Sequence, residues 1–189
     1  MENRPLPPLK PETGGGIEQG TDLPTLTDPD LAAATRALRA RHPELHWEEF
    51  CRYVRDVFLK IQHSWSSGHW EEARPYETDF LFTQHRYWIE RYKKENLKNC
   101  LADIQITNIV PVKIVVDAYL ESITVRIYAR MKDWTEDSSG NVVGGSKKED
   151  RIFSEYWIFL RSAGKPAKPR TQVENCPSCG APLDRVSES

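Results

Sequence analysis

A long amphipathic helix followed only by strand-like segments is the feature that most restricts how this chain can fold. Gly68 ends the helical pattern, and a further helix begins near Thr78, which can cap its first turn. The apolar residues of the long helix recur at intervals of three and four: Phe50, Val54, Val57, Phe58, Ile61 and Trp65. They form one apolar face, which needs a second layer of structure to cover it.

After Cys100 the spacing of apolar residues changes from about 3.6 to about 2, which is typical of β-strands. Strand-like alternation covers residues 104–116, 123–131 and 151–161. Pro111 indicates a bulge or an edge position in the first of these segments. We therefore predict an α+β fold in which helices pack on a strongly curved antiparallel sheet, and such a cone-shaped sheet tends to enclose a pocket.

Charge and cysteine usage exclude several classes of protein. The chain holds 28 acidic and 26 basic side chains, so its net charge is −2 and no overall positive field attracts nucleic acid. No run of about 18 apolar residues is present. Cys51 and Cys100 are isolated from each other, which fits a reducing compartment better than an exported protein. We expect a soluble, cytoplasmic protein that does not bind nucleic acid.

The composition divides the chain into five segments. Residues 1–27 hold five prolines and a run of three glycines, and we expect them to be disordered. Residues 28–43 are predicted to form a short leading helix, and residues 44–161 the cone-shaped domain. Residues 162–175 are read as a basic linker or a weak last strand, and residues 176–189 as half of a zinc ribbon.

Four stretches of the sequence together resemble a known family. They are FCRYVRDVFLKIQHSWSSGHWEEARPYETDFLF from residue 50, ITNI from residue 106, DSSGNVVGG from residue 137 and EYWIFLR from residue 155. Their spaced aromatic residues resemble the C-terminal domain of the mitochondrial import-motor anchor, subunit 44 of the inner-membrane translocase. The resemblance spans about residues 44–161.

This resemblance implies a fold and a role. The fold is the cone of the nuclear-transport-factor-two-like (cystatin-like) proteins, and the role is that of a non-enzymatic binding or scaffold domain. The family implies a place at the cytoplasmic face of a membrane, peripheral at the inner membrane, with a part in protein transport. Bacterial members carry a zinc ribbon behind the domain, so the chain resembles the bacterial type.

We expect the cone to hold a segment of a protein partner or a lipid acyl chain in an apolar pocket. The residues expected to line this pocket are Phe50, Val54, Phe58, Trp65, Trp88, Ile106, Ile127 and Trp157.

A small-molecule enzyme, an isomerase or a hydrolase, is the alternative on the same fold. Such an enzyme needs an acid and a base that converge inside the pocket. The inward candidates form no recognisable catalytic set: His85, Tyr87, Asp117, Tyr128 and Glu155. We therefore expect no enzymatic activity.

Two cysteines near the end of the sequence carry the sharpest chemical signal. Cys176 and Cys179 are separated by two residues and followed by a glycine, which is typical of a zinc knuckle. A closed structural zinc site needs four ligands, and this pair supplies two. Three interpretations stay open: a second knuckle follows this sequence, a second chain supplies it in a homodimer, or the pair binds no metal.

A basic stretch lies between the predicted domain and this cysteine pair. Its cations are Arg161, Lys165, Lys168 and Arg170. Each cation near an anionic bilayer contributes about 1 kcal/mol, so four would give weak, salt-sensitive attachment. The alternative is a solvated linker without a binding role.

Overall fold

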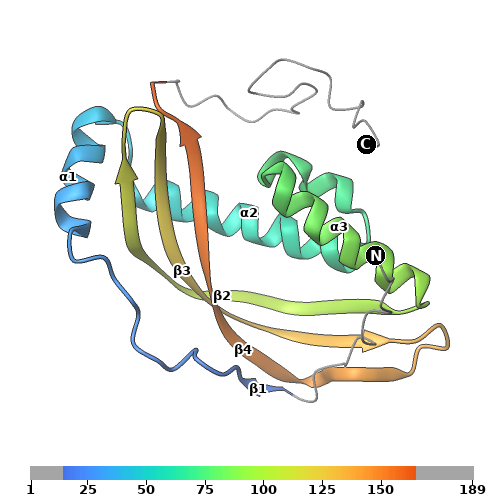
Figure 1. Ribbon diagram of the computed structural model, residues 1–189. Coiled ribbons are helices and arrows are strands. Elements are labelled where there is room, and N and C mark those ends of the chain that lie inside the picture. Colours follow the sequence, from blue (N-terminus) through green and yellow to red (C-terminus); the bar gives the residue numbers. More distant parts are fainter. Residues whose placement is uncertain (1–14, 165–189) are drawn as a thin grey trace, which may run out of the picture.

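The structure is a computed structural model, and it describes residues 15–164. Its helices are α1 (Leu31–Arg41), α2 (Trp47–Ser67), the 3-10 helix η1 (Trp70–Tyr76) and α3 (Asp79–Lys94). Its strands are β1 (Gly16–Ile17), β2 (Lys98–Val116), β3 (Leu120–Glu136) and β4 (Val142–Ser162). The predicted order of helices before long strands is confirmed, and so is the α+β class (Figure 1).

The four strands form one mixed sheet in the order β1-β4-β3-β2. β2, β3 and β4 pair antiparallel, as expected, but β1 adds to β4 in parallel, so the expectation of a purely antiparallel sheet was wrong at this edge. Within the described residues the sheet does not close into a barrel. The narrower assignment to the nuclear-transport-factor-two-like fold stays a prediction.

The long strands bend strongly, and α2 lies across the concave side that the bend creates (Figure 1). In β2 the register with β3 shifts three times, between Ala102 and Gln105, between Ile106 and Asn108, and between Pro111 and Lys113. Such bulges increase local twist and bend a strand. β2 is an edge strand, so the missing N–H of Pro111 does not remove a hydrogen bond from the middle of the sheet. The prediction that Pro111 marks a bulge or an edge position is confirmed.

Local signals set the ends of the two longer helices. Gly68 ends α2 in the left-handed conformation, with φ of 74°, and its N–H donates to the carbonyl of Trp65 at 3.1 Å. Thr78 caps α3, because its hydroxyl accepts from the N–H of Leu81. Both signals had been predicted from the sequence.

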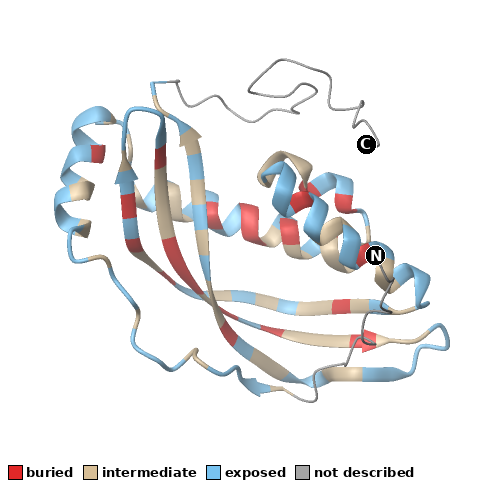
Figure 2. Ribbon diagram, in the orientation of Figure 1, coloured by how far each residue is buried: buried red, intermediate tan, exposed pale blue. Residues whose placement is uncertain are grey.

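Two packed clusters of side chains hold the layers together. Buried residues occur both on the helices and on the long strands (Figure 2). In the first, Val54 and Phe58 of α2 pack on the inner face of the sheet, against residues Ile109, Val125, Ile127, Ala129, Met131 and Phe153. In the second, α2 packs on η1 and α3 through Val57, Ile61, Trp70, Ala73, Phe82 and Ile89. α2 is therefore buried on two sides and joins the sheet to the outer helices.

Residues 15–27, the N-terminal strap, cross the outer face of the sheet, where the sequence had led us to expect a disordered tail. The side chain of Arg126 is the reason. It is 2% exposed and donates to the carbonyls of Gly20, Thr21 and Leu23 at 2.8, 3.1 and 2.8 Å. Its guanidinium also lies over the rings of Tyr128 and Tyr156, at 4.7 and 5.5 Å. These contacts offset the entropy cost of ordering a segment with few apolar side chains.

A buried carboxylate joins the loop after α1 to the ends of β3 and β4. Glu121 is 3% exposed, and it accepts hydrogen bonds from His42 at 2.9 Å and from Arg161 at 2.6 Å. Burial would by itself raise the pKa of Glu121, but the hydrogen bonds from His42 and Arg161 outweigh it and lower that pKa. The folded protein thus favours the ionised carboxylate.

We expect Glu121→Gln to lower the free energy of unfolding by about 2 kcal/mol at pH 7, because a charge-assisted pair is lost. A carboxyl group whose pKa is lower in the folded state stabilises the fold above its ordinary pKa, and this contribution is lost as the pH falls through the folded value. The difference between variant and wild type should therefore shrink between about pH 5 and pH 3, as measured by urea unfolding.

Glu44 provides the control for this prediction. Its carboxylate is 71% exposed and lies 3.4 Å from the same histidine. We expect Glu44→Gln to change stability by less than about 0.5 kcal/mol. A Glu121→Gln deficit that stays constant over the acid range would show that ionisation of Glu121 does not stabilise the fold.

Candidate functional site

An exposed face with several aromatic side chains lies on α3. Phe80 is 75% exposed and Trp88 36%, and Leu81 and Tyr87 are also exposed. Residues spaced by one, seven and eight lie on the same side of an α-helix, because it turns about 100° per residue. The side chains therefore form one outward stripe, and Tyr87 and Trp88 contact each other with their ring centroids 5.4 Å apart.

The opposite side of α3 provides its packing. Phe82 and Ile89 are buried against α2 and η1, and the indole N–H of Trp70 donates to the carbonyl of Phe82 at 3.1 Å. The helix thus has two apolar sides, and within residues 15–164 only the side with Phe82 and Ile89 packs against other elements. The sequence pattern did not show which of the two stripes faces the core.

A small hollow opens beside the C-terminal end of α3. It has a volume of about 230 Å³ and lies where the end of α2 and the start of β2 meet α3. Its apolar lining residues are Trp65, Ile89, Tyr92 and Leu97, and its lysines are Lys93 and Lys98. The floor is fixed by the indole N–H of Trp65, which donates to the side-chain oxygen of Asn99 at 2.9 Å.

A histidine of α3 pairs with the glutamate that follows η1. Nδ1 of His85 lies 2.6 Å from Oε1 of Glu77, whose side chain is 1% exposed. Oε2 of Glu77 has no hydrogen-bond partner among residues 15–164. The rings of Trp65 and Trp70 meet the imidazole edge-on at 6.0 and 5.2 Å. The pair joins Glu77, which follows η1, to His85 of α3, whose side chain is 33% exposed.

The other acid and base candidates also make structural contacts and do not converge. Oδ1 of Asp117 accepts the N–H groups of Tyr119 and Leu120 in the turn between β2 and β3, and these bonds lower the pKa of Asp117. Glu155 accepts the indole N–H of Trp157 at 2.8 Å, and Tyr128 stacks on the guanidinium of Arg126. None of these contacts joins one candidate to another, and the expectation of no enzymatic activity stays a prediction.

The residues expected to line an apolar pocket lie mostly inside the packed core. Val54, Phe58 and Ile127 are buried in the first cluster, and Phe50, Ile106 and Trp157 pack against it. Trp65 packs against the second cluster and also borders the small hollow beside α3. Trp88, by contrast, lies on the exposed stripe of α3. Seven of the eight residues thus lie in the two packed clusters or against them.

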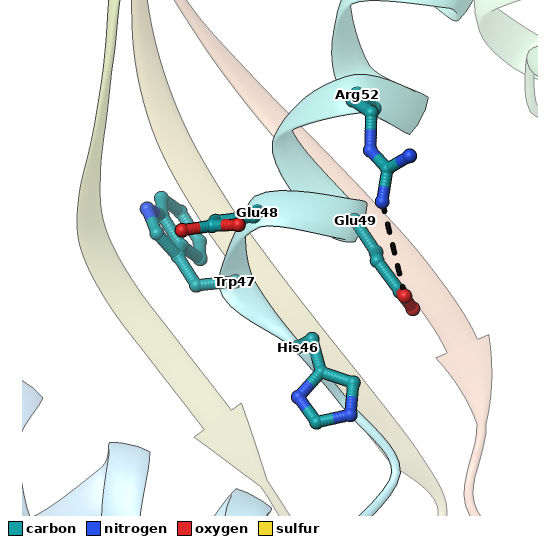
Figure 3. A pocket seen from close by; sticks show the side chains of 5 residues that line it. All are labelled: His46, Trp47, Glu48, Glu49 and Arg52. Atoms are coloured by element: carbon teal, nitrogen blue, oxygen red, sulfur yellow. Dashed lines mark ion pairs between the residues drawn. The ribbon is translucent and has the colours of Figure 1, made fainter.

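A second hollow, of about 430 Å³, lies at the start of α2 (Figure 3). It is lined by His46, Trp47, Glu48, Glu49 and Arg52, which all come from one stretch of chain. Arg52 and Glu49 form an exposed ion pair of 3.8 Å. The lining is exposed and mostly polar, so this hollow provides neither an enclosed apolar site nor a set of converging groups.

The cations and cysteines predicted near the C-terminal end lie mostly outside the described residues. Arg161 is at the end of β4, where its Nε donates to Glu121. Lys165, Lys168 and Arg170 lie outside residues 15–164, and so do Cys176 and Cys179. Cys51 and Cys100 are free thiols, and burial raises the pKa of each. Among the described residues no group of three or more metal-binding side chains occurs.

The model of the Tim44-like domain family matches residues 31–173, three quarters of the chain. The chain belongs to the Tim44-like family. No curated protein matches the sequence. The resemblance to subunit 44 of the translocase is thereby confirmed at the level of the family, while the bacterial type and the zinc-ribbon tail stay predictions.

Membership of the Tim44-like family supports a coarse functional statement. The family is generally a non-catalytic scaffold domain, with peripheral membrane association, protein partners and a role in protein transport. Within the described residues, no helix has the length and apolar character needed to span a bilayer.

Proposed function

We propose that this Tim44-like domain is a scaffold that lies on a membrane with the exposed stripe of α3 in the headgroup layer. The observation that supports this is the composition of the stripe: Phe80, Leu81, Tyr87 and Trp88 on one side of one helix. Tryptophan and tyrosine are enriched at membrane interfaces, because their rings are apolar and their polar ends stay in contact with water. A helix of this kind lies in the plane of the membrane surface.

The charge along α3 supports an anionic membrane. Its last turn carries Arg91, Lys93 and Lys94, and Lys98 follows at the start of β2. Two of these cations already have partners in the domain: Arg91 pairs with Glu95 at 2.9 Å, and the ammonium of Lys93 donates to the carbonyl of Gly68 at 3.1 Å. Cations beside an amphipathic helix attract anionic headgroups, at about 1 kcal/mol each near the surface. Attachment should therefore weaken as salt is added.

The hollow beside α3 has a secondary place in this proposal. Ligand pockets usually have volumes of roughly 300–1,000 Å³, whereas this hollow has about 230 Å³. A full acyl chain needs more room than that. We therefore assign the membrane contact to the stripe, and the hollow can take at most a short apolar group next to Lys93 and Lys98.

We expect the double variant Phe80→Ser, Trp88→Ser to bind anionic vesicles about 30-fold more weakly than wild type. Two partly inserted aromatic side chains account for about 2 kcal/mol of transfer free energy. Co-sedimentation with vesicles that contain phosphatidylglycerol, and with neutral phosphatidylcholine vesicles, measures this difference. A salt titration on the anionic vesicles then separates the contribution of the cations.

A matched control removes two exposed apolar side chains from another part of the molecule. Tyr119 is 83% exposed and Leu120 48%, and both lie at the turn between β2 and β3. The variant Tyr119→Ser, Leu120→Ser should bind vesicles like wild type. Equal loss in both variants, or no binding by wild type, would rule out α3 as the membrane-contact element.

A further inference from the structure

Strand β4 has a long unpaired edge. β1 pairs with β4 only at Arg151 and Ile152, so residues 154–162 have β3 on one side and no strand of residues 15–164 on the other. Open edges of this length can pair with a strand of another chain. α1 and α2 make their backbone contacts with the sheet at β2, on the opposite edge. α2 reaches β4 through side chains, with the rings of Phe50 and Tyr53 5.4 and 5.9 Å from that of Phe159 on the inner face, and no strand of residues 15–164 pairs with the edge itself at residues 154–162.

The backbone of this edge is directed outward at alternate residues. The carbonyl of Ile152 accepts the N–H of Glu18 across the edge at 2.8 Å. Hydrogen-bonding directions alternate along a strand, and the register of β4 with β3 is regular from Asp150 to Ser162. The residues with free N–H and C=O groups at the edge are therefore Ser154, Tyr156, Ile158, Leu160 and Ser162.

The three central residues of this set present largely apolar side chains to solvent on the outer face. Ile158 is 62% exposed, and Tyr156 and Leu160 are close to half exposed. Proteins normally protect such an edge with charges, prolines or short strands. Here the central five residues, Tyr156 to Leu160, carry no charge and no proline. An edge of this composition is a template for pairing with another strand.

The sequence of the edge is complementary to itself. Residues 154–162 read Ser-Glu-Tyr-Trp-Ile-Phe-Leu-Arg-Ser, and the two halves match around Ile158. We propose that β4 pairs antiparallel with β4 of a second copy of this chain, about a two-fold axis at Ile158. Ile158 then meets its own counterpart, and Tyr156 lies opposite Leu160 on the outer face. On the inner face Trp157 lies opposite Phe159, and Glu155 lies opposite Arg161.

Charge selects this register over its neighbours. A shift of the axis by one residue in either direction separates Glu155 from Arg161 and places a charge opposite an apolar or hydroxyl side chain. Arg161 already binds Glu121 through Nε, and a guanidinium has four further N–H donors for a second carboxylate. The pairing ends where Ser162 meets Ser154, before the two residues that β1 already covers. The proposed dimer therefore keeps the strap in place.

Sedimentation velocity of the full chain tests this interface. We expect a reversible dimer that forms over roughly 1–100 μM protein. Ile158→Lys should raise the dissociation constant at least tenfold, because two ammonium groups then face each other at the axis. Hydrogen exchange gives an independent measurement: amide protection of residues 154–162 should increase with protein concentration in wild type and not in Ile158→Lys.

Two controls keep the result specific. Phe80→Lys makes the same exchange of an exposed apolar side chain for a lysine on α3, and it should leave the dimer unchanged. Cys176→Ser, Cys179→Ser, measured with a chelator, removes association through thiols or metal, and the dimer should persist. A chain that stays monomeric over the whole range, or a dimer that Ile158→Lys does not weaken, would overturn the proposal. Because neither control depends on lipid, this outcome is separate from the vesicle experiment.

Discussion

Phe58→Ala is expected to lower the free energy of unfolding by about 4 kcal/mol, the largest effect of any single substitution considered. Phe58 is fully buried where α2 meets the sheet. The centroid of its ring lies 5.4 Å from the ring centroid of Trp157 and 6.5 Å from that of Phe153. Truncation removes buried apolar surface and leaves a cavity whose aromatic walls cannot collapse without moving a helix or a strand.

Urea unfolding followed by far-ultraviolet circular dichroism measures this loss. Phe80→Ala removes the same side chain from the exposed stripe of α3, where the ring is 75% exposed, and should cost less than about 0.5 kcal/mol. Equal costs for the two substitutions would mean that α2 does not pack on the sheet as described.

Arg126→Met is expected to release the N-terminal strap and to lower the free energy of unfolding by about 3 kcal/mol. Methionine retains most of the apolar stem but cannot donate to the carbonyls of Gly20, Thr21 and Leu23. It also loses the cationic contact with the rings of Tyr128 and Tyr156. Without these contacts the strap has little apolar burial to hold it on the sheet.

A protease specific for glutamate reports the release directly. In the folded wild type, Glu18 is held by Arg151 at 2.7 Å and lies in the strap, so cleavage after Glu18 should be slow. It should become at least tenfold faster in Arg126→Met. Arg130→Met is the control on the same strand, because Arg130 binds Gln105 and Asp150, and none of its hydrogen bonds or ion pairs within residues 15–164 reaches the strap. Unchanged cleavage in Arg126→Met would contradict the role given to this arginine.

Much of the fold could be predicted because local signals and apolar spacing agree. The stripe from Phe50 to Trp65, the stop at Gly68 and the change of period after Cys100 place α2 and the long strands. The strap could not be predicted in this way. Residues 15–27 have the composition of a tail, and they are ordered by Arg126, more than 100 residues later in the chain. A buried arginine without a nearby carboxylate in sequence gives no local signal of this kind.

The candidate site was harder to predict than the fold. Phe80, Tyr87 and Trp88 have the spacing of a buried helical face, and from this spacing Trp88 was expected to line a pocket. The core instead takes Phe82 and Ile89, because η1 positions Trp70 against that side of α3. Spacing alone cannot rank two apolar stripes on one helix, since the choice depends on which stripe meets another element. Seven of the eight residues expected to line a pocket pack in or against the two clusters, and the pocket itself stays a prediction.

The central claim is that α3 enters the membrane surface with Trp88 in contact with lipid. Tryptophan fluorescence on vesicles whose acyl chains carry bromine tests it directly, because bromine quenches only indoles that reach the lipid. The chain has six tryptophans, and the five others are half-buried or buried. We expect brominated vesicles to quench wild type, and Trp88→Phe to bind the same vesicles with most of that quenching lost. Equal quenching of the two proteins at equal binding would contradict the account.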